Sequence, residues 1–280
     1  MAADRGVELM RAARKQRGVA LLTAILVVAI GTVLATNLMW LLTLDQRRTA
    51  AALAHDQGLQ YALGAEAWAG DILQQDLVES PDSDHLGEFW AIEIDPLPIE
   101  GGFITGRIED LQGRFNLNNL VTPLGEEDPL IVEQFERLLV LVDLDPIMAG
   151  AVVDWLDSDI DMRFPYGGED EAYARAEPQY LAANGMMTTT SELMAIIGFD
   201  RESYAALSPY VAALPMGTNI NVNTASDVVL ASLSDQIDLS TARSLVDERA
   251  GLDFPNVRER FQGLVAEDML PRIDGVSEHF

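Results

Sequence analysis

The stretch from Gly18 to Leu44 reads GVALLTAILVVAIGTVLATNLMWLLTL, and it contains no Asp, Glu, Lys, Arg or His. At about 1.5 Å per residue, a helix of this length crosses the hydrocarbon core of a bilayer. The charged residues before it are Asp4, Arg5, Glu8, Arg11, Arg14, Lys15 and Arg17. Because a basic excess on a short flank keeps that flank in the cytoplasm, we expect one membrane span at residues 19–44, with the rest of the chain on the far side.

Two ordinary explanations of this segment are a signal anchor and a cleaved secretory signal. A signal anchor fits the composition. A cleaved signal fits poorly, because its apolar region is about 7–15 residues long and ends at a site of small residues. The run here is longer and has no such site at its end.

The junction Arg17-Gly18-Val19 resembles the processing site of type IV prepilin-like proteins. The resemblance implies that a prepilin peptidase cuts after Gly18, so that the mature chain begins at Val19. Most pilins and pseudopilins carry Glu at the place of Thr23. A Glu in a membrane helix needs a partner, which in pilins is the terminal amine of the neighbouring subunit. Without that Glu, the subunit has no such bond to make with a subunit ahead of it, as expected at the end of a fibre.

The chain has 280 residues and a formal net charge of −27. Residues 1–44 hold five of the basic and two of the acidic residues, which leaves residues 45–280 with a formal charge of −30. This field repels nucleic acid and anionic lipid and favours divalent cations or basic partners, although solubility alone also explains it. Because the chain has no cysteine, disulfides and thiolate metal sites are excluded, and an exported domain must be held by its core, with or without a metal.

The helical pattern continues past the membrane segment, and we expect one helix from Val19 to Leu77. Residues 79–84 (ESPDSD) end it, because Pro removes a donor while Ser and Asp favour turns. Residues 89–95 (FWAIEID) and 102–110 (GFITGRIED) are predicted strands, joined by a turn that contains two glycines. A long N-terminal helix followed by antiparallel strands is the layout of a pilin-like domain, and the predicted class is α+β.

The rest of the chain is mostly helical in pattern, with helices expected at 131–142, 146–156 and 202–214. It contains a weak internal repeat: residues 116–120 (NLNNL) and 221–225 (NVNTA) each precede an apolar helix, a turn with Asp and a helix with Val-Asp. This unit resembles the helix-hairpin-helix module, whose best-known use is binding of the DNA backbone. The hairpins lack Gly-rich turns, and no Lys follows Lys15. We therefore expect no nucleic-acid binding. We expect the asparagines of the repeat to cap helices or to satisfy loop backbone.

The densest group of acidic side chains lies in residues 154–171 (DWLDSDIDMRFPYGGEDE). Carboxylates that alternate along a loop can converge, and a second acidic group after the glycine pair can close the shell. The candidate ligands are Asp157, Asp159, Asp161, Glu169, Asp170 and Glu171.

Oxygen-only ligands suit calcium, and no Cys or nearby His favours zinc. The spacing is not that of an EF-hand, because Met162 stands at the place of its glycine and Gly168 at the place of its closing Glu. The alternative is a solvated acidic loop. Mutual repulsion of clustered carboxylates favours a bound cation.

Several motifs, in order along the chain, are similar to the general secretion pathway protein K family, the large minor pseudopilins of type II secretion systems. They are the GVALL start, DLQGRFNLNNL (110–120), VDWLDSD (153–159), GEDEAY (168–173), SEL (191–193) and LPMGTNINVNTA (214–225). The resemblance implies a long N-terminal transmembrane helix on a pilin-like antiparallel sheet, with a large, mostly helical domain inserted in it. It also implies that the acidic loop binds calcium, with Asp161 and Glu171 the weaker ligands.

The resemblance further implies a place in a bacterial inner membrane, with the N-terminus cytoplasmic and the C-terminal domain periplasmic. The implied partners are two smaller minor pseudopilins in a tip complex, the major pseudopilin, the prepilin peptidase and the inner-membrane assembly platform. Leader cleavage and methylation are implied with them. The implied role is that of the pseudopilus tip subunit, which starts assembly and caps the fibre for protein export across the outer membrane.

The expected divisions of the chain are a leader (1–18), a transmembrane helix (19–44), a pilin-like helix and strands (45–115), the inserted helical domain (116–265) and a return toward the pilin-like sheet (266–280). Family members usually return to strands after the helical domain. This sequence ends where such a strand would begin, so either it is truncated or its sheet lacks the last strands. The segment around Met162–Tyr166 also differs from the small polar loop usual in the family.

No catalytic motif is present: the sequence has no GxSxG, HExxH, P-loop or GxGxxG pattern, and its three histidines lie far from any Ser-Asp constellation. We therefore expect no enzyme. The alternative to a secretion subunit is a membrane-anchored extracytoplasmic binding module of the DNA-uptake type, built on the helix-hairpin-helix resemblance. Such a module needs a basic hairpin face, which the sequence lacks.

Overall fold

The computed structural model describes residues 3–249, 253–254 and 256–280, with side chains described from Val19 onward. The chain divides into two compact units, residues 1–66 and residues 67–280. All five basic side chains of the leader and the predicted cleavage position Gly18 precede Val19, so their surroundings lie outside the described side chains.

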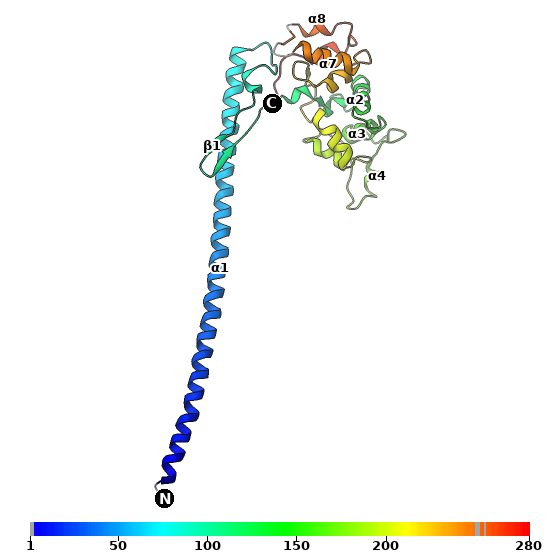
Figure 1. Cartoon of the computed structure of the whole chain (residues 1–280). Coiled ribbons are helices and arrows are strands. Elements are labelled where there is room, and N and C mark those ends of the chain that lie inside the picture. The colour runs from blue at the N-terminus through cyan, green and yellow to red at the C-terminus, as the bar shows by residue number, and fades with distance from the viewer. Residues whose placement is uncertain (1–2, 250–252, 255) are drawn as a thin grey trace. The chain divides into compact units, whose positions relative to one another are not determined.

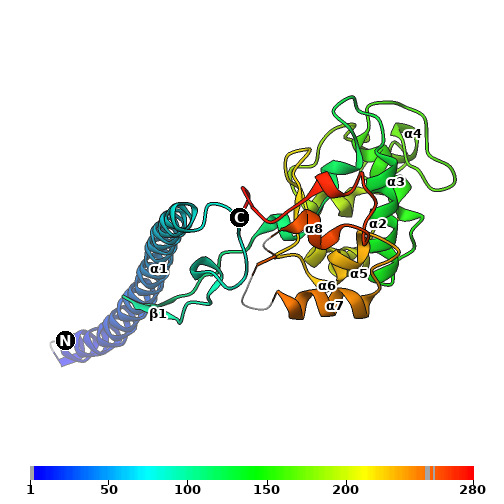
Figure 2. The ribbon, with the colours of Figure 1, turned by 90° about the horizontal axis from the view of Figure 1, so that it is seen from above.

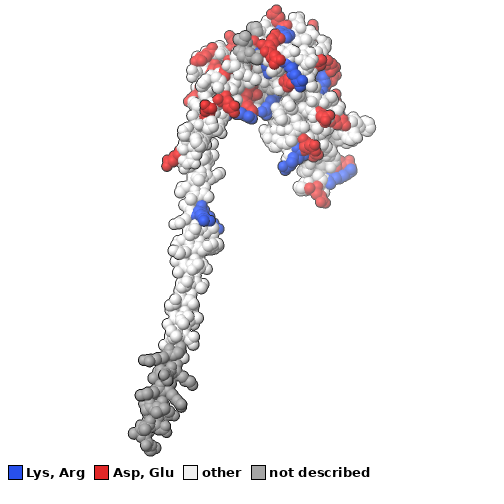
Figure 3. All heavy atoms as spheres, in the orientation of Figure 1, with Lys and Arg blue, Asp and Glu red and all other residues white. Residues whose placement is uncertain are grey.

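The first unit consists of helix α1, which runs unbroken from Ala3 to Glu79 and so also enters the second unit (Figure 1). Its apolar stretch reaches a mean hydropathy of 2.5 over 18 residues, and no part of that window is buried. In Figure 3 the described surface of this stretch carries no Lys, Arg, Asp or Glu. Within the described residues, α1 is the one helix long and apolar enough to cross a membrane. Its last residue, Glu79, lies two residues beyond the predicted end.

The second unit has short strands and several helices. The α-helices after α1 are α2 (Pro129–Leu141), α3 (Met148–Leu156), α4 (Asp170–Tyr173), α5 (Arg201–Leu207), α6 (Asp227–Ser232), α7 (Leu239–Glu248) and α8 (Val257–Phe261). The 3-10 helices are η1 (Phe89–Ala91), η2 (Leu111–Gly113), η3 (Leu117–Leu120), η4 (Thr190–Ala195), η5 (Ser208–Tyr210) and η6 (Leu270–Arg272). The strands are β1 (Leu97–Ile99), β2 (Gly102–Ile104), β3 (Phe115–Asn116), β4 (Val211–Ala212), β5 (Ile220–Asn221) and β6 (Ile273–Asp274).

An antiparallel hairpin follows α1, as expected for a pilin-like layout, but its strands are shorter and displaced. β1 pairs with β2 in the register Leu97↔Ile104, with Gly101 at φ 92° in the turn. The predicted strand at 89–95 is wrong: residues 89–91 form a 3-10 helix, and the indole of Trp90 is buried and donates to Glu88. Of the predicted strand 102–110, only residues 102–104 are paired with β1, because β1 has only three residues to pair with.

The hydrophobic core of the second unit lies among its helices. α2 packs against α3 and α6, and α6 packs against α7 (Figure 2). Phe115 and Phe135 stack in this core with ring centroids 5.2 Å apart. Pro129 begins α2, where a missing N–H costs nothing, and the Asp128 side chain accepts from the Ile131 N–H. Helices α2 and α3 confirm the predictions at 131–142 and 146–156 to within two residues at each end.

The helix predicted at 202–214 is wrong in its second half. α5 ends at Leu207 and is followed by the 3-10 turn η5 and by β4, which pairs in parallel with β3 in the register Phe115↔Val211. Pro209 explains the change, because its ring cannot continue an α-helix and supplies no N–H to it. The freed segment then pairs with β3.

The asparagine repeat seen in the sequence is a structural repeat. Asn116 ends β3 and Asn221 ends β5, and each side chain accepts from the N–H two residues later, at 3.1 and 2.9 Å. The second asparagine of each motif accepts a backbone N–H from a distant segment: Asn118 from Met187 at 2.8 Å and Asn223 from Phe254 at 2.9 Å. The prediction that these side chains satisfy loop backbone is confirmed, and each strand then leads to a helix pair, α2–α3 or α6–α7.

Residues 266–280 contain one short strand, which pairs in parallel with β5 in the register Ile220↔Ile273. It does not extend the β1–β2 hairpin, contrary to the expected return to that sheet. The tail does return to the residues that follow α1: the Leu111 N–H donates to the His279 carbonyl at 3.0 Å, and Phe280 packs edge-to-face on Trp90. Buried polar contacts at Asn221 hold the strand where it lies, because a shift would leave them unpaired.

Candidate metal centre

The acidic loop leaves the C-terminal end of α3 and closes at the start of α4. Asp157 follows directly after α3 and caps its C-terminal end, where its N–H donates to the Val153 carbonyl at 2.9 Å. Inside the loop, the carboxylate of Asp154, which is 1% exposed, accepts the Arg163 N–H at 3.0 Å. Arg163 in turn forms an ion pair with Glu127, in the segment before α2. These contacts fold the loop back over its own helix.

Three carboxylates meet where the two ends of the loop come together. Asp157, Asp159 and Glu169 each present one oxygen, and these oxygens all lie within 4.8 Å of one another. Asp157 and Glu169 are 7% and 8% exposed, whereas Asp159 is exposed. Within the part of the chain that the structure describes, Asp157 Oδ1 and both oxygens of Glu169 are buried without a hydrogen-bond partner. The structure thus brings together three of the six predicted ligands, from both ends of the loop.

The remaining three predicted ligands lie elsewhere in the same loop. The Asp161 N–H donates to Asp159 Oδ1 at 2.7 Å, which fixes the Asp159 side chain, while Asp161 itself is outside the three-carboxylate group. Asp170 Oδ1 accepts the Ala182 N–H at 3.0 Å. Glu171 forms an ion pair with Arg175 one turn later in the chain. Each of the two latter carboxylates therefore already has a protein partner.

Sequence reasoning missed two residues that shape this loop. Asp154 belongs to the acidic stretch but is not one of the six predicted ligands, and the signal for its structural role is its place in the apolar helix α3, where it is buried. Gly167 lies against it: a Cβ there would stand 2.5 Å from both the backbone nitrogen and oxygen of Arg163 and would also meet Asp154 Oδ2. Only glycine fits at this position without displacing the loop.

Burial and neighbouring carboxylates raise the pKa values of two carboxyl groups of this centre. Burial above all, followed by nearby carboxylates led by Asp159, raises the pKa of Asp157 to about 6. Burial, followed by carboxylates led by Asp154, raises the pKa of Glu169 to about 7. Both groups thus resist ionisation when nothing positive lies between them.

The residues present fit a hard cation. Three carboxylates converge, and two of them, Asp157 and Glu169, have buried oxygens without a partner among the described residues. Calcium prefers such oxygen donors, and bidentate binding and water can complete the about six to eight oxygens that it takes. Within the described chain, His55, His85 and His279 are not part of this group, so zinc-type nitrogen ligation has no support here. The spacing along the chain differs from an EF-hand.

The assembly position predicted at Thr23 lies in the apolar part of α1. Its hydroxyl donates to the carbonyls of Ala20 and Val19 at 3.0 and 3.2 Å. The polar group is therefore satisfied within its own helix and needs no second chain, unlike a carboxylate at the same place.

Stability without calcium should fall as pH rises from about 4.5 to about 7. In the unfolded chain Glu169 loses its proton near 4.5, while the folded chain keeps it to about 7. The folded state binds more protons across this window, so the proton-linked stability present below pH 4.5 is lost by pH 7. Thermal unfolding in chelator should show the decline, and Glu169→Gln should flatten it. Identical pH profiles for the two proteins would contradict this.

An apolar N-terminal helix long enough to cross a membrane, a short antiparallel hairpin and a helical domain with an acidic loop define an α+β protein of the pilin-like class. Family models described as type II secretion system (T2SS), protein K, match residues 113–216 and 220–272. Together they cover more than half of the chain, and the boundary between them falls between the two asparagine repeats. The chain belongs to the type II secretion system protein K family, whose members are minor pseudopilins and structural components of the secretion machinery.

Two relatives support the same family assignment. The chain is 39% identical to type II secretion system protein K of Pseudomonas aeruginosa over 86% of this chain and 74% of that protein. It is 35% identical to the protein of the same name from Aeromonas hydrophila over 86% of this chain and 78% of that protein.

A solved structure also matches. A chain in the crystal structure of the GspK-GspI-GspJ complex from enterotoxigenic Escherichia coli superposes with a TM-score of 0.73 at 28% identity. The match covers 82% of this chain and 85% of that chain. It supports the predicted α+β class with a long N-terminal helix.

Proposed function

We propose that this protein is the tip subunit of a type II secretion pseudopilus, where it starts assembly and caps the fibre. The observation that carries the proposal is the similarity to a chain solved in a complex of GspK, GspI and GspJ. By analogy, two smaller minor pseudopilins bind this chain and complete the tip. The inserted domain between residues 116 and 265 adds bulk that stacked fibre subunits have no room for, which favours the end of the fibre.

The anchor helix gives the protein its place before assembly. The prepilin peptidase cuts after Gly18, the N-terminus faces the cytoplasm, and the second unit lies in the periplasm. The processed helix then packs against the major pseudopilin as the inner-membrane platform drives assembly. A threonine at position 23 suits a first subunit, because its hydroxyl is satisfied by Ala20 and Val19 of its own helix.

Thr23→Glu should alter pseudopilus assembly and reduce secretion. The new carboxylate would seek the terminal amine of a subunit ahead, so that the variant competes for places along the fibre instead of only starting it. Pseudopilus length and secreted protein would be measured in cells, with Thr23→Val as the control that removes the hydroxyl without adding charge. Assembly and secretion equal to those of the parent and of Thr23→Val would count against the proposed role of this position.

Calcium is the proposed ion of the acidic loop, held by Asp157, Asp159 and Glu169. It would supply the positive charge that three converging carboxylates lack, and so tie the end of α3 to the start of α4. The protein's own part is to hold these oxygens together through Asp154, Arg163 and Gly167. An ordered loop presents a fixed surface to partners at the tip.

Asp159→Ala should abolish the stabilisation that this loop gains from calcium. Asp159 is exposed and has no ion pair among the described residues, so its removal should leave the chelator-treated protein folded. The melting temperature in calcium and in chelator would be compared, with Asp161→Ala as the matched control from the same loop. A calcium-dependent shift as large in Asp159→Ala as in the parent would rule Asp159 out as a ligand.

A further inference from the structure

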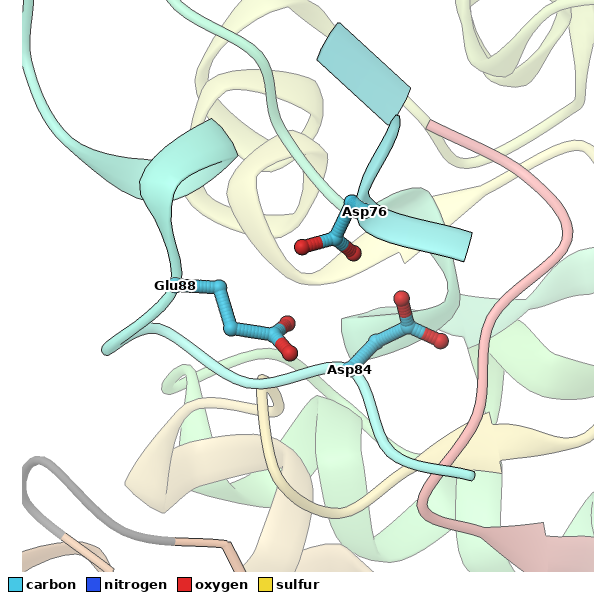
Figure 4. Close-up of side chains that lie close together, drawn as sticks. All are labelled: Asp76, Asp84 and Glu88. Atoms are coloured by element: carbon cyan, nitrogen blue, oxygen red, sulfur yellow. The ribbon is translucent and has the colours of Figure 1, made fainter. Parts of the chain in front are cut away.

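A second group of carboxylates lies where α1 ends, far along the chain from the acidic loop. Asp76 belongs to the last turns of α1, and Asp84 and Glu88 belong to the segment that follows it. One oxygen from each of the three lies within 4.8 Å of the others. Figure 4 shows the three side chains turned toward a common space.

Glu88 is aimed into this space by contacts on only one of its oxygens. Its Oε2 accepts the His85 N–H and the Trp90 Nε1–H, both at 2.8 Å. Its Oε1 is buried and has no hydrogen-bond partner among the described residues, in a side chain that is only 9% exposed. A buried carboxylate oxygen without a donor is costly, so a group that can neutralise it is expected at this point.

The protein supplies little positive charge there. Among the ion pairs of the described residues, none includes Asp76, Asp84 or Glu88. The nearby imidazole of His85 uses its Nδ1 to accept the Gly87 N–H at 3.0 Å. Three carboxylates, two of them buried, thus face one another without a guanidinium between them.

We propose that Asp76, Asp84 and Glu88 bind a divalent cation, with calcium preferred over magnesium. The donors are all carboxylate oxygens, which hard cations prefer. Calcium bonds oxygen at about 2.3–2.6 Å, so ligands on opposite sides of it stand about 5 Å apart, close to the limit set by these three oxygens. Magnesium bonds at about 2.0–2.1 Å and would require the three side chains to contract.

The site lies where an ion would link the end of α1 to the C-terminal tail. The Asp84 N–H donates to the Gly275 carbonyl at 2.8 Å, and Asp84 Oδ2 accepts the Ser277 N–H at 2.6 Å. A cation held by Asp84 and Asp76 therefore joins the last turns of α1 to the C-terminal tail. The proposal is independent of calcium binding by the acidic loop, because the two groups share no residue.

Protons are the competing occupants of the cluster. Burial above all, and then the charges of Glu88 and Asp84, raise the pKa of Asp76 to about 6. Neutralisation by protons would need no metal, so the experiment must separate the two.

Calcium bound to the full chain, purified in detergent and freed of metal with chelator, would be counted by equilibrium dialysis at pH 7.5. Three proteins would be compared: the parent, Glu88→Gln and Asp71→Asn, an exposed acid of the same helix that lies outside the cluster. Glu88→Gln keeps an acceptor for Trp90 but removes the charge. We expect it to bind one ion fewer than the parent, or to bind that ion more than about tenfold more weakly, since even outer-shell changes cost about 10–100-fold. Calcium binding equal to that of the parent would overturn the proposal.

The same comparison in the Asp157→Asn/Asp159→Asn background separates this site from the acidic loop. Calcium retained in that background and lost on adding Glu88→Gln supports the proposal, whether or not the loop binds calcium. No calcium in that background overturns it.

Melting temperatures in calcium, magnesium and chelator give a second readout. If the cluster holds calcium, Glu88→Gln should shrink the gain from calcium while leaving the value in chelator equal or higher, because one repelling charge is gone. A variant that loses the same number of degrees in calcium and in chelator has a merely structural defect, and that result would contradict the proposal.

Discussion

Asn221→Ala is expected to lower the free energy of unfolding by roughly 2–4 kcal/mol. The side chain is fully buried and joins three segments. Its Nδ2 lies 3.0 Å from both the Asp84 carbonyl and Asp110 Oδ2, and 2.8 Å from Ser277 Oγ. Because an amide has two hydrogens, these acceptors share them, and alanine would leave several buried polar groups without a partner.

The effect of Asn221→Ala can be measured by urea unfolding followed by tryptophan fluorescence. Asn219→Ala is the matched control, since the Asn219 side chain makes no hydrogen bond among the described residues and should change stability by no more than about 0.5 kcal/mol. A loss of under about 0.5 kcal/mol in Asn221→Ala would show that the junction of the post-α1 segment, β5 and the tail does not depend on this side chain.

Gly167→Ala is expected to cost about 1–3 kcal/mol and to remove the calcium response of the acidic loop. The added Cβ would stand 2.5 Å from the Arg163 nitrogen and oxygen, against backbone that cannot move aside without shifting the loop. It would also push on the Asp154 carboxylate, which holds the loop to α3. Asp157 and Glu169 would then no longer converge.

Gly185→Ala provides the control for this substitution. A Cβ there would have its nearest neighbour at 3.6 Å, an ordinary contact, so both stability and the calcium response should be kept. Thermal unfolding of both variants in calcium and in chelator makes the comparison. A Gly167→Ala protein that melts like the parent under both conditions would show that the loop tolerates the methyl group and that its packing on Asp154 is unimportant.

The sequence predicted the elements that depend on local chemistry. The end of α1 follows from the Ser-Pro-Asp stretch after Glu79, and α2 and α3 follow from apolar periodicity. The asparagine motifs were recognisable as a repeat because their spacing is fixed by local Asx bonds. At the candidate site, three of six acidic residues converge because they lie at the two ends of one short loop.

Features set by distant contacts were not predictable in the same way. The strand at 89–95 failed because Trp90 turns inward to meet Glu88 and Phe280, a contact from the far end of the chain. The strand β4 forms only because β3, which lies 95 or more residues earlier, offers a partner. No sequence motif singles out Asp76, Asp84 and Glu88, and only the fold shows that they meet.

Binding to the two smaller minor pseudopilins is the direct test of whether this chain is the tip subunit. Residues 45–280 would be mixed, in calcium, with the two smaller minor pseudopilins of the same secretion system, and the mass would be measured by light scattering after size exclusion. We expect a stable complex with one copy of each protein. Three separate species at the concentrations used would contradict it.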